Sequence, residues 1–129
     1  MSNLKMKKIV NFTQHHPTPE QGKAGVYNPA EWEKIKELLT FDELPSREEV
    51  FARARQLTEI ALAEHERTGA VEVMIGGAPF FMPALYHALL SKGLIPVFAF
   101  SRRVSVEKKN PDGTVTKTQV FKHEGFVRF

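Results

Sequence analysis

Two adjacent histidines follow a short apolar run near the start of the chain, in the segment IVNFTQHHPTPEQ of residues 9–21. Imidazole changes its charge close to neutral pH, so His15 and His16 can act as general acid or base, or contact a phosphate as imidazolium. A role in capping the loop is an equally good interpretation. No metal is expected, because adjacent histidines rarely ligate one ion together and neither an HExxH motif nor a carboxylate cluster accompanies them.

Two further segments carry residues suited to an anionic ligand. Gly76 and Gly77 follow the apolar run VEVMI. A glycine pair lets the backbone approach a ligand closely, and a helix that follows directs its positive end at the same place. The alternative is a tight strand-to-helix turn that needs glycine for its backbone angles. This pair matches neither a dinucleotide-binding fingerprint nor a phosphate-binding loop of the nucleoside triphosphatases.

The third segment is Ser101-Arg102-Arg103, directly after the apolar run IPVFAF. A guanidinium can hold a phosphate through two hydrogen bonds, although the alternation of a strand allows only one of the two arginines to face a pocket. Alternatively, both only mark the start of a hairpin. The candidate catalytic residues are therefore His15, His16 and Arg102, and the candidate ligand-binding residues are Asn11, Thr13, Gln14, Gly76, Gly77, Ser101 and Arg103.

The residues that thiol chemistry and a serine-hydrolase motif require are absent from the chain. The chain has no cysteine, which excludes disulfides, thiolate zinc sites and cysteine nucleophiles. No serine lies in a GxSxG motif, and no cofactor is expected. Duplex nucleic acid is not an expected partner, because RNA-module signatures are absent and most phenylalanines lie in core-like positions.

The elements that must position these residues can be predicted from periodicity and capping signals. Strands are expected at 7–13, 71–76 and 95–100, since each is a short apolar run that ends at Pro, Gly or polar residues. A helix is expected from Pro29 to about Leu38, capped by Asn28, and a second from Ser46, with Glu49 three residues later, to about residue 67. A third helix follows Pro79, ends at Gly93 and is apolar on most sides, so we expect it to be well buried.

These elements predict one α/β domain over residues 1–129. Strand, helix and strand within some 30 residues form a βαβ unit, so we expect a Rossmann-like, mainly parallel sheet flanked by helices. Residues 103–122 alternate about the turn 110–113 and predict a C-terminal hairpin appended to the sheet. Ligands of such sheets bind at the carboxyl ends of the strands, where all three candidate segments begin.

Charge is unevenly distributed. Residues 1–28 hold four Lys against one Glu, residues 29–100 seven basic against eleven acidic side chains, and residues 101–129 seven basic against three acidic ones. The basic ends can form a positive face suited to phosphates, or only a solvated surface. The apolar stretch after the basic start is far too short for a signal peptide or a membrane span, so we expect a cytoplasmic protein that makes no membrane contact.

The opening stretch IVNFTQHHPTPEQ resembles the beginning of small stand-alone CRISPR-associated Rossmann-fold (CARF-like) proteins, among them the ring nucleases of type III systems. GGAPFFMPAL, followed by a strand and arginines, is compatible with that layout. The chain also resembles uncharacterised bacterial and mobile-element proteins of this size. In such a protein His15 and His16 match the loop after the first strand, Gly76 and Gly77 the turn after a central strand, and Arg102 a basic contact.

The resemblance implies a function in antiviral defence. It implies a homodimer whose two sheets present their carboxyl ends to a shared pocket for a cyclic oligoadenylate. Cleavage would need no metal, because the ribose 2′-hydroxyl attacks the neighbouring phosphate and polar or cationic groups stabilise the charge. The doubled histidine and the basic hairpin depart from the family's pattern. The alternative function is a non-enzymatic nucleotide sensor or protein-interaction module of the same fold.

Overall fold

The computed structural model describes residues 7–129, so Met1 to Met6 of the basic N-terminal segment lie outside the described residues. Its strands are β1 (Ile9–Phe12), β2 (Val26–Tyr27), β3 (Glu72–Ile75), β4 (Ile95–Lys109) and β5 (Val115–Arg128). They form one sheet in the order β2-β1-β3-β4-β5. The first four are parallel to their neighbours and β5 is antiparallel to β4. The prediction of an α/β fold with a mainly parallel sheet and a C-terminal hairpin is confirmed.

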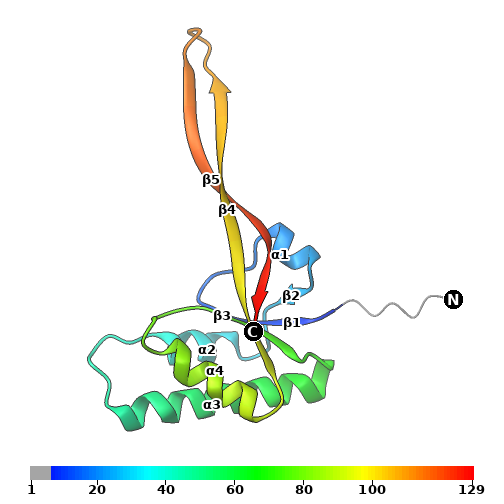
Figure 1. The fold of residues 1–129 in the computed structure, drawn as a ribbon, viewed down its shortest axis with the longest axis vertical. Coiled ribbons are helices and arrows are strands. Elements are labelled where there is room, and N and C mark those ends of the chain that lie inside the picture. The colour runs from blue at the N-terminus through cyan, green and yellow to red at the C-terminus, as the bar shows by residue number, and fades with distance from the viewer. Residues whose placement is uncertain (1–6) are drawn as a thin grey trace, which may run out of the picture.

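Helices cover the two faces of this sheet unequally. The helices are α1 (Pro19–Lys23), α2 (Trp32–Leu39), α3 (Arg47–Thr68) and α4 (Met82–Ser91). The last three lie together on one face, here called the helical face, and the five-residue α1 lies on the other (Figure 1). A doubly wound sheet has helices of comparable size on both faces. The structure therefore establishes a mixed α/β sheet flanked by helices, without the even cover expected of a Rossmann-like fold.

The main core lies between the sheet and the helical face. Phe12 and Ile75 of the strands pack there against Ile35, Leu57 and Leu85 of the three helices, and all five are at most 2% exposed. A smaller cluster lies on the other face and consists of Ile9, Val26, Met74 and Val97, with Phe126 packed against it. Apolar residues at consecutive strand positions thus point to both faces, which explains why the strands read as continuous apolar runs.

The helix expected after Ser46 is confirmed at both ends. The Ser46 hydroxyl oxygen accepts a hydrogen bond from the Glu49 N–H at 3.1 Å, which satisfies one of the free donors of the first turn. Gly69 ends the helix with a φ of 81°, a left-handed conformation that glycine adopts at little cost. Ala54, Leu57 and Ala61 face the core at helical spacing.

The expectation that α4 is well buried was wrong in part. Only Leu85 and Leu89 are buried in this helix. Leu90 is 42% exposed, and Met82 and Tyr86 are half-buried. The helix is apolar around most of its circumference, but α3 and the sheet cover only one side of it, so apolar surface remains exposed.

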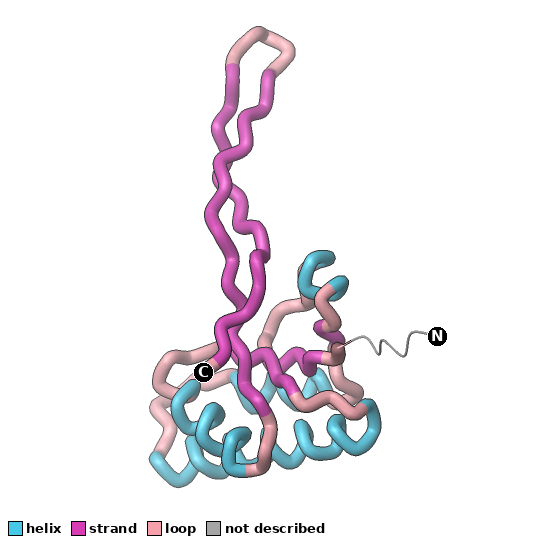
Figure 2. The backbone as a smooth tube through the Cα atoms, turned by 45° about the vertical axis from the view of Figure 1, so that its right-hand side comes forward, coloured by secondary structure: helices cyan, strands magenta, loops and turns pink. Residues whose placement is uncertain are grey.

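The hairpin is much longer than the predicted one. Strand β4 does not end at Phe100 but continues to Lys109, and β5 pairs with it from Val97–Arg128 out to Lys109–Val115, with a β-bulge at Phe100/Ser101. Beyond the sheet, residues 101–124 form a two-stranded ribbon, here called the arm, that projects far from the body of the protein (Figures 1 and 2). β3 ends at Ile75, so the outer part of β4 has only β5 as its neighbour.

The tip of the arm closes with the predicted turn. Gly113 has a φ of 87°, and Asp112 Oδ1 accepts hydrogen bonds from the Thr114 hydroxyl at 2.5 Å and the Thr114 N–H at 3.0 Å. The hydroxyl bond is the main cause that lowers the pKa of Asp112, since it favours the ionised carboxylate.

We expect Thr114→Val to move the pKa of Asp112 back up toward its ordinary value. A carboxyl whose pKa is depressed in the folded state adds stability that is present above its unfolded pKa and is lost as the pH falls through its folded pKa. The ordered tip should therefore loosen at a higher pH in the variant than in the wild type. NMR titration of the Asp112 side chain measures both pKa values, and equal values would contradict the assigned cause.

Candidate functional site

A crevice opens where the order of the strands reverses. The chain passes from β1 outward to β2, returns past β1 to β3 and continues to β4, so the connections leave β1 and β3 in opposite directions. Ligands of open α/β sheets bind outside the carboxyl ends of the strands at such a point. The crevice has a volume of about 420 Å³ and is lined by residues 13–16, Thr18 and Gln21, residues 74–77, and Phe98 and Ala99.

Asn11 organises the loop that follows β1. Its side chain is fully buried, and its Oδ1 accepts from the Thr13 N–H at 3.1 Å and the Thr13 hydroxyl at 2.7 Å. Its Nδ2 donates to the His15 carbonyl oxygen at 2.8 Å. These bonds turn the chain sharply after Phe12, so that the two histidines come to the mouth of the crevice.

A chain of side-chain amides connects this turn to His16. Asn11 Nδ2 also donates to Asn28 Oδ1 at 2.8 Å, and Asn28 Nδ2 lies 3.3 Å from His16 Nδ1. Backbone groups fix the orientation of the Asn11 amide, so its NH₂ points at Asn28 Oδ1. The NH₂ of Asn28 therefore faces the His16 ring. His16 Nδ1 is then an acceptor, and the neutral ring carries its proton on Nε2.

Trp32 supports the loop from the first turn of α2. Its indole N–H donates to the Thr13 carbonyl oxygen at 2.9 Å, and the His16 ring packs against the indole at an interplanar angle of 58°, with 4.4 Å between centroids. Trp32 was not among the predicted site residues, and Asn28 was expected to cap this helix. The helix instead begins at Trp32, with Glu31 in the capping position and no side-chain cap, so the amide of Asn28 is available to the loop.

Helix α1 closes one side of the crevice and was not predicted. Thr18 caps it: its hydroxyl accepts from the Gln21 N–H at 3.1 Å, while Gln21 Oε1 accepts from the Thr18 N–H at 3.0 Å. Gln21 is buried and lines the crevice. The signal was present, because Thr-Pro-Glu-Gln has the spacing of a capping box with proline at the first helical position.

Gly76 and Gly77 form the opposite wall. A Cβ on Gly76 would lie 3.3 Å from Thr13 Cγ2, which shows how closely the two loops approach. Gly77 has a φ of 149°, a conformation that other residues rarely adopt. The following helix contributes less than expected to an anion site, since the Met82 N–H bonds to the Ala78 carbonyl oxygen and Pro83 has no N–H.

We expect Gly77→Ala to lower the free energy of unfolding by about 1 kcal/mol, because the backbone angle is strained for alanine while space for the methyl group remains. Gly22→Ala is the matched control. It lies in α1, nothing lies within 4 Å of its added Cβ, and we expect no loss. Urea unfolding of both variants measures the difference, and equal stabilities would show that Gly77 is not strained.

The structure brings together two of the three predicted segments. Thr13, Gln14, His15, His16, Gly76 and Gly77 line the crevice, and Asn11 lies directly beneath it. Ser101 to Arg103 do not line it, because β4 continues past Ala99 into the arm. Arg102 forms an ion pair with Glu124 at 2.9 Å, and the Arg103 guanidinium lies 5.5 Å from the centre of the Phe121 ring.

Within residues 7–129, no group of three or more His, Cys, Asp or Glu side chains is arranged to hold a metal ion. None of the helices in that range combines the length and apolar character needed to cross a membrane.

Fold and site together define an α/β protein with a crevice of polar and apolar lining at the point where the strand order of a five-stranded mixed sheet reverses. The chain belongs to the family described as the Uncharacterized protein MJ1673 family, which matches residues 7–127. Comparisons with curated proteins and with solved structures give no match. The family's description states no activity, so the nucleotide ligand and the relation to CARF-like proteins stand as proposals.

Proposed function

We propose that the crevice between β1 and β3 binds a nucleotide, with a cyclic oligoadenylate as the first candidate, and that the two histidines promote its cleavage without a metal ion. One observation carries this proposal: the histidine loop after β1 and the glycine pair after β3 line one crevice at the strand-order reversal. Nucleotide-binding sheets of the Rossmann-like class use this position. The resemblance of the opening segment to ring nucleases supports the choice of ligand.

The crevice offers groups suited to transfer of a phosphoryl bond within the ligand. In this reaction the ribose 2′-hydroxyl loses its proton and its oxygen attacks the adjacent phosphorus. The bond to the 5′-oxygen breaks, that oxygen takes up a proton, and the product carries a 2′,3′-cyclic phosphate. His15, whose ring is exposed at the mouth, would accept the first proton, and His16 Nε2–H would donate a hydrogen bond to the phosphate or the leaving oxygen.

Orientation would contribute as much as proton transfer. The amide chain and the Trp32 ring hold His16 in one position before the ligand arrives. A group that is already in place does not have to be ordered during the reaction. The glycine pair leaves backbone exposed to the ligand on the opposite wall.

A specific observation favours a second candidate function, a sensor that binds the nucleotide without cleaving it. Among residues 7–129, those that line the crevice include no Lys or Arg. Phosphoryl transfer enzymes usually neutralise developing charge with such cations or with a metal. A site that lacks them can still bind through hydrogen bonds and aromatic contacts.

Thermal shift and mass-spectrometric turnover assays test both functions. The purified protein, with chelator present, is incubated with cyclic tri-, tetra- and hexa-adenylate, linear oligoadenylates and mononucleotides. Stabilisation together with linear products that end in a 2′,3′-cyclic phosphate supports the nuclease. Stabilisation without products supports the sensor. If no probe stabilises the protein and no probe is cleaved, the proposal that this crevice binds a nucleotide is overturned.

A further inference from the structure

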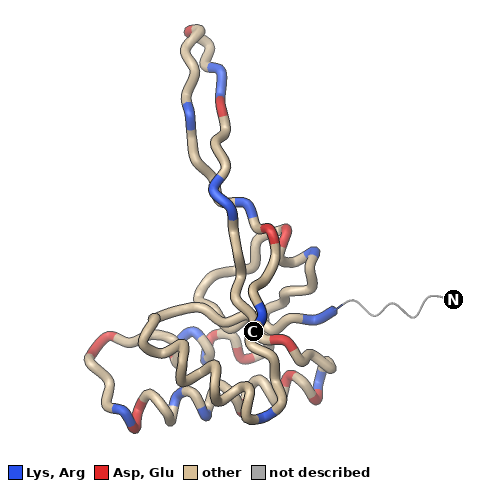
Figure 3. The backbone as a smooth tube through the Cα atoms, viewed as in Figure 1, with Lys and Arg blue, Asp and Glu red and all other residues tan. Residues whose placement is uncertain are grey.

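An apolar cleft lies beside the crevice, on the helical face. It has a volume of about 700 Å³ and lies between the first turns of α4, the glycine pair after β3 and the lower end of the hairpin. Residues 73–91, which include α4, contain no Lys, Arg, Asp or Glu, and Figure 3 shows this stretch in tan throughout. A cavity with such walls accommodates an uncharged, apolar or aromatic part of a ligand.

Three aromatic rings form one wall of the cleft. The rings of Tyr86 and Phe98 are nearly parallel, at 18°, with 6.4 Å between centroids. The Phe129 ring stands across both, at 76° and 71°, with its centroid 6.1 Å from each. Phe129 is 83% exposed and the other two are half-buried, so the wall is open to solvent. Nucleobases stack on such rings, because every base presents a flat π-face.

The cleft and the crevice share a boundary. Gly76, Gly77 and Phe98 line both cavities. A Cβ on Gly76 would point to Thr13 on the crevice side, and a Cβ on Gly77 would lie 3.5 Å from Met82 Cε on the cleft side. Because neither glycine has a side chain, only backbone separates the two cavities at this point. One ligand can therefore extend from the crevice across the glycine pair into the cleft.

The two cavities offer complementary kinds of contact. The crevice presents imidazole, hydroxyl and amide groups, which orient a ribose and a phosphate, but its lining within residues 7–129 includes no Lys or Arg. In the described part of the chain, Tyr86 is the only residue of the cleft lining with a side-chain oxygen or nitrogen. A nucleotide has the same division, since a polar sugar and phosphate are joined to a flat, largely apolar base.

We propose that the cleft is the base-binding subsite for the nucleotide whose ribose and phosphate lie in the crevice. This inference rests on the proposed nucleotide function of the crevice and adds the residues that recognise the base: Tyr86, Phe98 and Phe129. Walls of this kind respond to the area of the ring that they cover more than to the hydrogen-bonding edge of the base. The subsite therefore favours purines over pyrimidines.

NMR titration of the full chain with AMP, UMP and ribose 5-phosphate tests the subsite, because it detects weak binding and locates it. AMP should shift the ring signals of Tyr86 and Phe129 together with those of His16. Ribose 5-phosphate should shift the His16 signals alone. We expect AMP to bind at least about tenfold tighter than ribose 5-phosphate, with UMP between them, because stacking of one base on aromatic side chains contributes a factor of this size.

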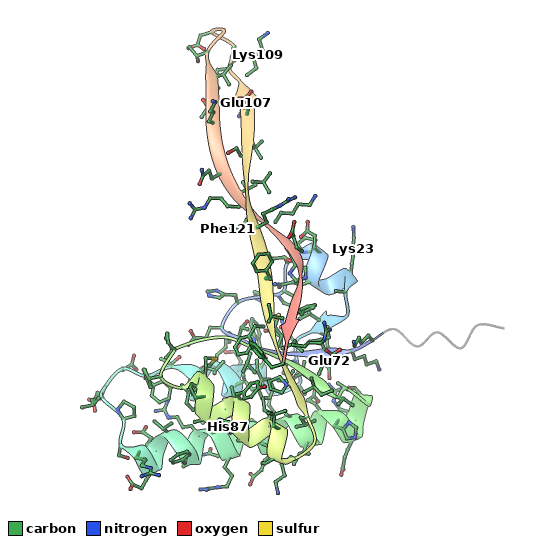
Figure 4. The ribbon with its side chains drawn as sticks, viewed as in Figure 1. Lys23, Glu72, His87, Glu107, Lys109 and Phe121 are labelled. Atoms are coloured by element: carbon green, nitrogen blue, oxygen red, sulfur yellow. The ribbon has the colours of Figure 1, made fainter. Side chains whose placement is uncertain are left out.

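Variants of the rings separate stacking from folding. Phe129→Ala and Tyr86→Leu should each weaken AMP binding by about five- to tenfold and leave the affinity for ribose 5-phosphate unchanged. Tyr86→Phe keeps the ring and should bind AMP like the wild type. Phe121→Ala is the matched control, since Phe121 is 70% exposed and Figure 4 shows it on the arm, away from the body of the protein. We expect its AMP affinity to be unchanged.

Two results would overturn the subsite and leave the crevice function in place. These are equal affinities of AMP and ribose 5-phosphate with shifts at His16, and wild-type AMP affinity in Phe129→Ala. A wild-type dimer in sedimentation velocity that becomes a monomer in Phe129→Ala, with AMP affinity unchanged, would assign the aromatic wall to a second copy and also overturn the subsite. If none of the three probes shifts the His16 signals, the proposed function of the crevice fails, and the subsite fails with it.

Discussion

Replacing Asn11 with alanine is expected to lower the free energy of unfolding by about 2–4 kcal/mol. The side chain is fully buried, and its loss leaves the Thr13 N–H, the His15 carbonyl oxygen and Asn28 Oδ1 without their partner. Each buried polar group that loses its hydrogen bond costs about 1–3 kcal/mol, less where water can enter. The loop would also lose its turn, so ligand binding should fall with stability.

Urea unfolding followed by circular dichroism measures this loss. Asn110→Ala is the matched control, since Asn110 Nδ2 also donates two hydrogen bonds, to Thr114 and Thr116, but at the exposed tip of the arm. We expect it to cost less than about 1 kcal/mol. A similar cost for both variants would mean that burial of Asn11, and with it the organisation of the loop, contributes little.

Asn11→Asp gives a second and sharper comparison. Aspartate keeps the size of the side chain and can still accept from Thr13. It replaces the donating NH₂ by an oxygen that faces two acceptors, the His15 carbonyl and Asn28 Oδ1. We therefore expect Asn11→Asp to be at least as destabilising as Asn11→Ala at neutral pH, because two repulsive contacts replace two hydrogen bonds.

His16→Ala is expected to lower kcat/KM for the cleaved oligoadenylate by at least about 100-fold, if the crevice acts as a nuclease. Loss of one preorganised hydrogen-bond donor to the charge that develops in the transition state typically lowers the rate by factors of about 100 to 1,000. The melting temperature should change little, since the His16 side chain is exposed. His87→Ala is the control, because His87 is exposed on α4 and does not line the crevice.

Asn28→Ala separates positioning from chemistry at the same ring. It removes the partner of His16 Nδ1 while the ring itself remains, so we expect an intermediate loss in kcat/KM of about tenfold. KM should stay near its wild-type value. Full activity in His16→Ala would assign this hydrogen bond to another group. A loss in Asn28→Ala as large as that in His16→Ala would show that the ring acts only in its held position.

Several features of the fold could be predicted because their signals are local. Ser46 with Glu49 predicted the start of α3, Gly69 follows its end, and the turn around Asp112 predicted the tip of the hairpin. A cap or a turn depends on hydrogen bonds between residues two to four positions apart. The capping box of Thr18 and Gln21 is equally local and could have been predicted from its spacing.

The candidate site could be predicted only in part. The rule that ligands bind at the carboxyl ends of strands placed His15, His16, Gly76 and Gly77 at one crevice, because β1 and β3 are parallel neighbours that end in register. The rule failed for Arg102 because it assumed that a strand ends with its apolar run. Residues 101–109 remain extended because β5 supplies a backbone partner, and that partner lies 6 to 22 residues away along the chain.

The sequence by itself determined the start and end of α3, the turn of the hairpin and the residues that end β1 and β3, since each depends on propensity, periodicity or capping within a few residues. Only the tertiary structure decided that Asn28 contacts His16 instead of capping a helix, that three helices share one face, and that the arm leaves the body with apolar side chains exposed. Those outcomes depend on which distant backbone or side-chain groups become neighbours, and hydrogen bonds and packing between such neighbours outweigh the local preference of any single residue.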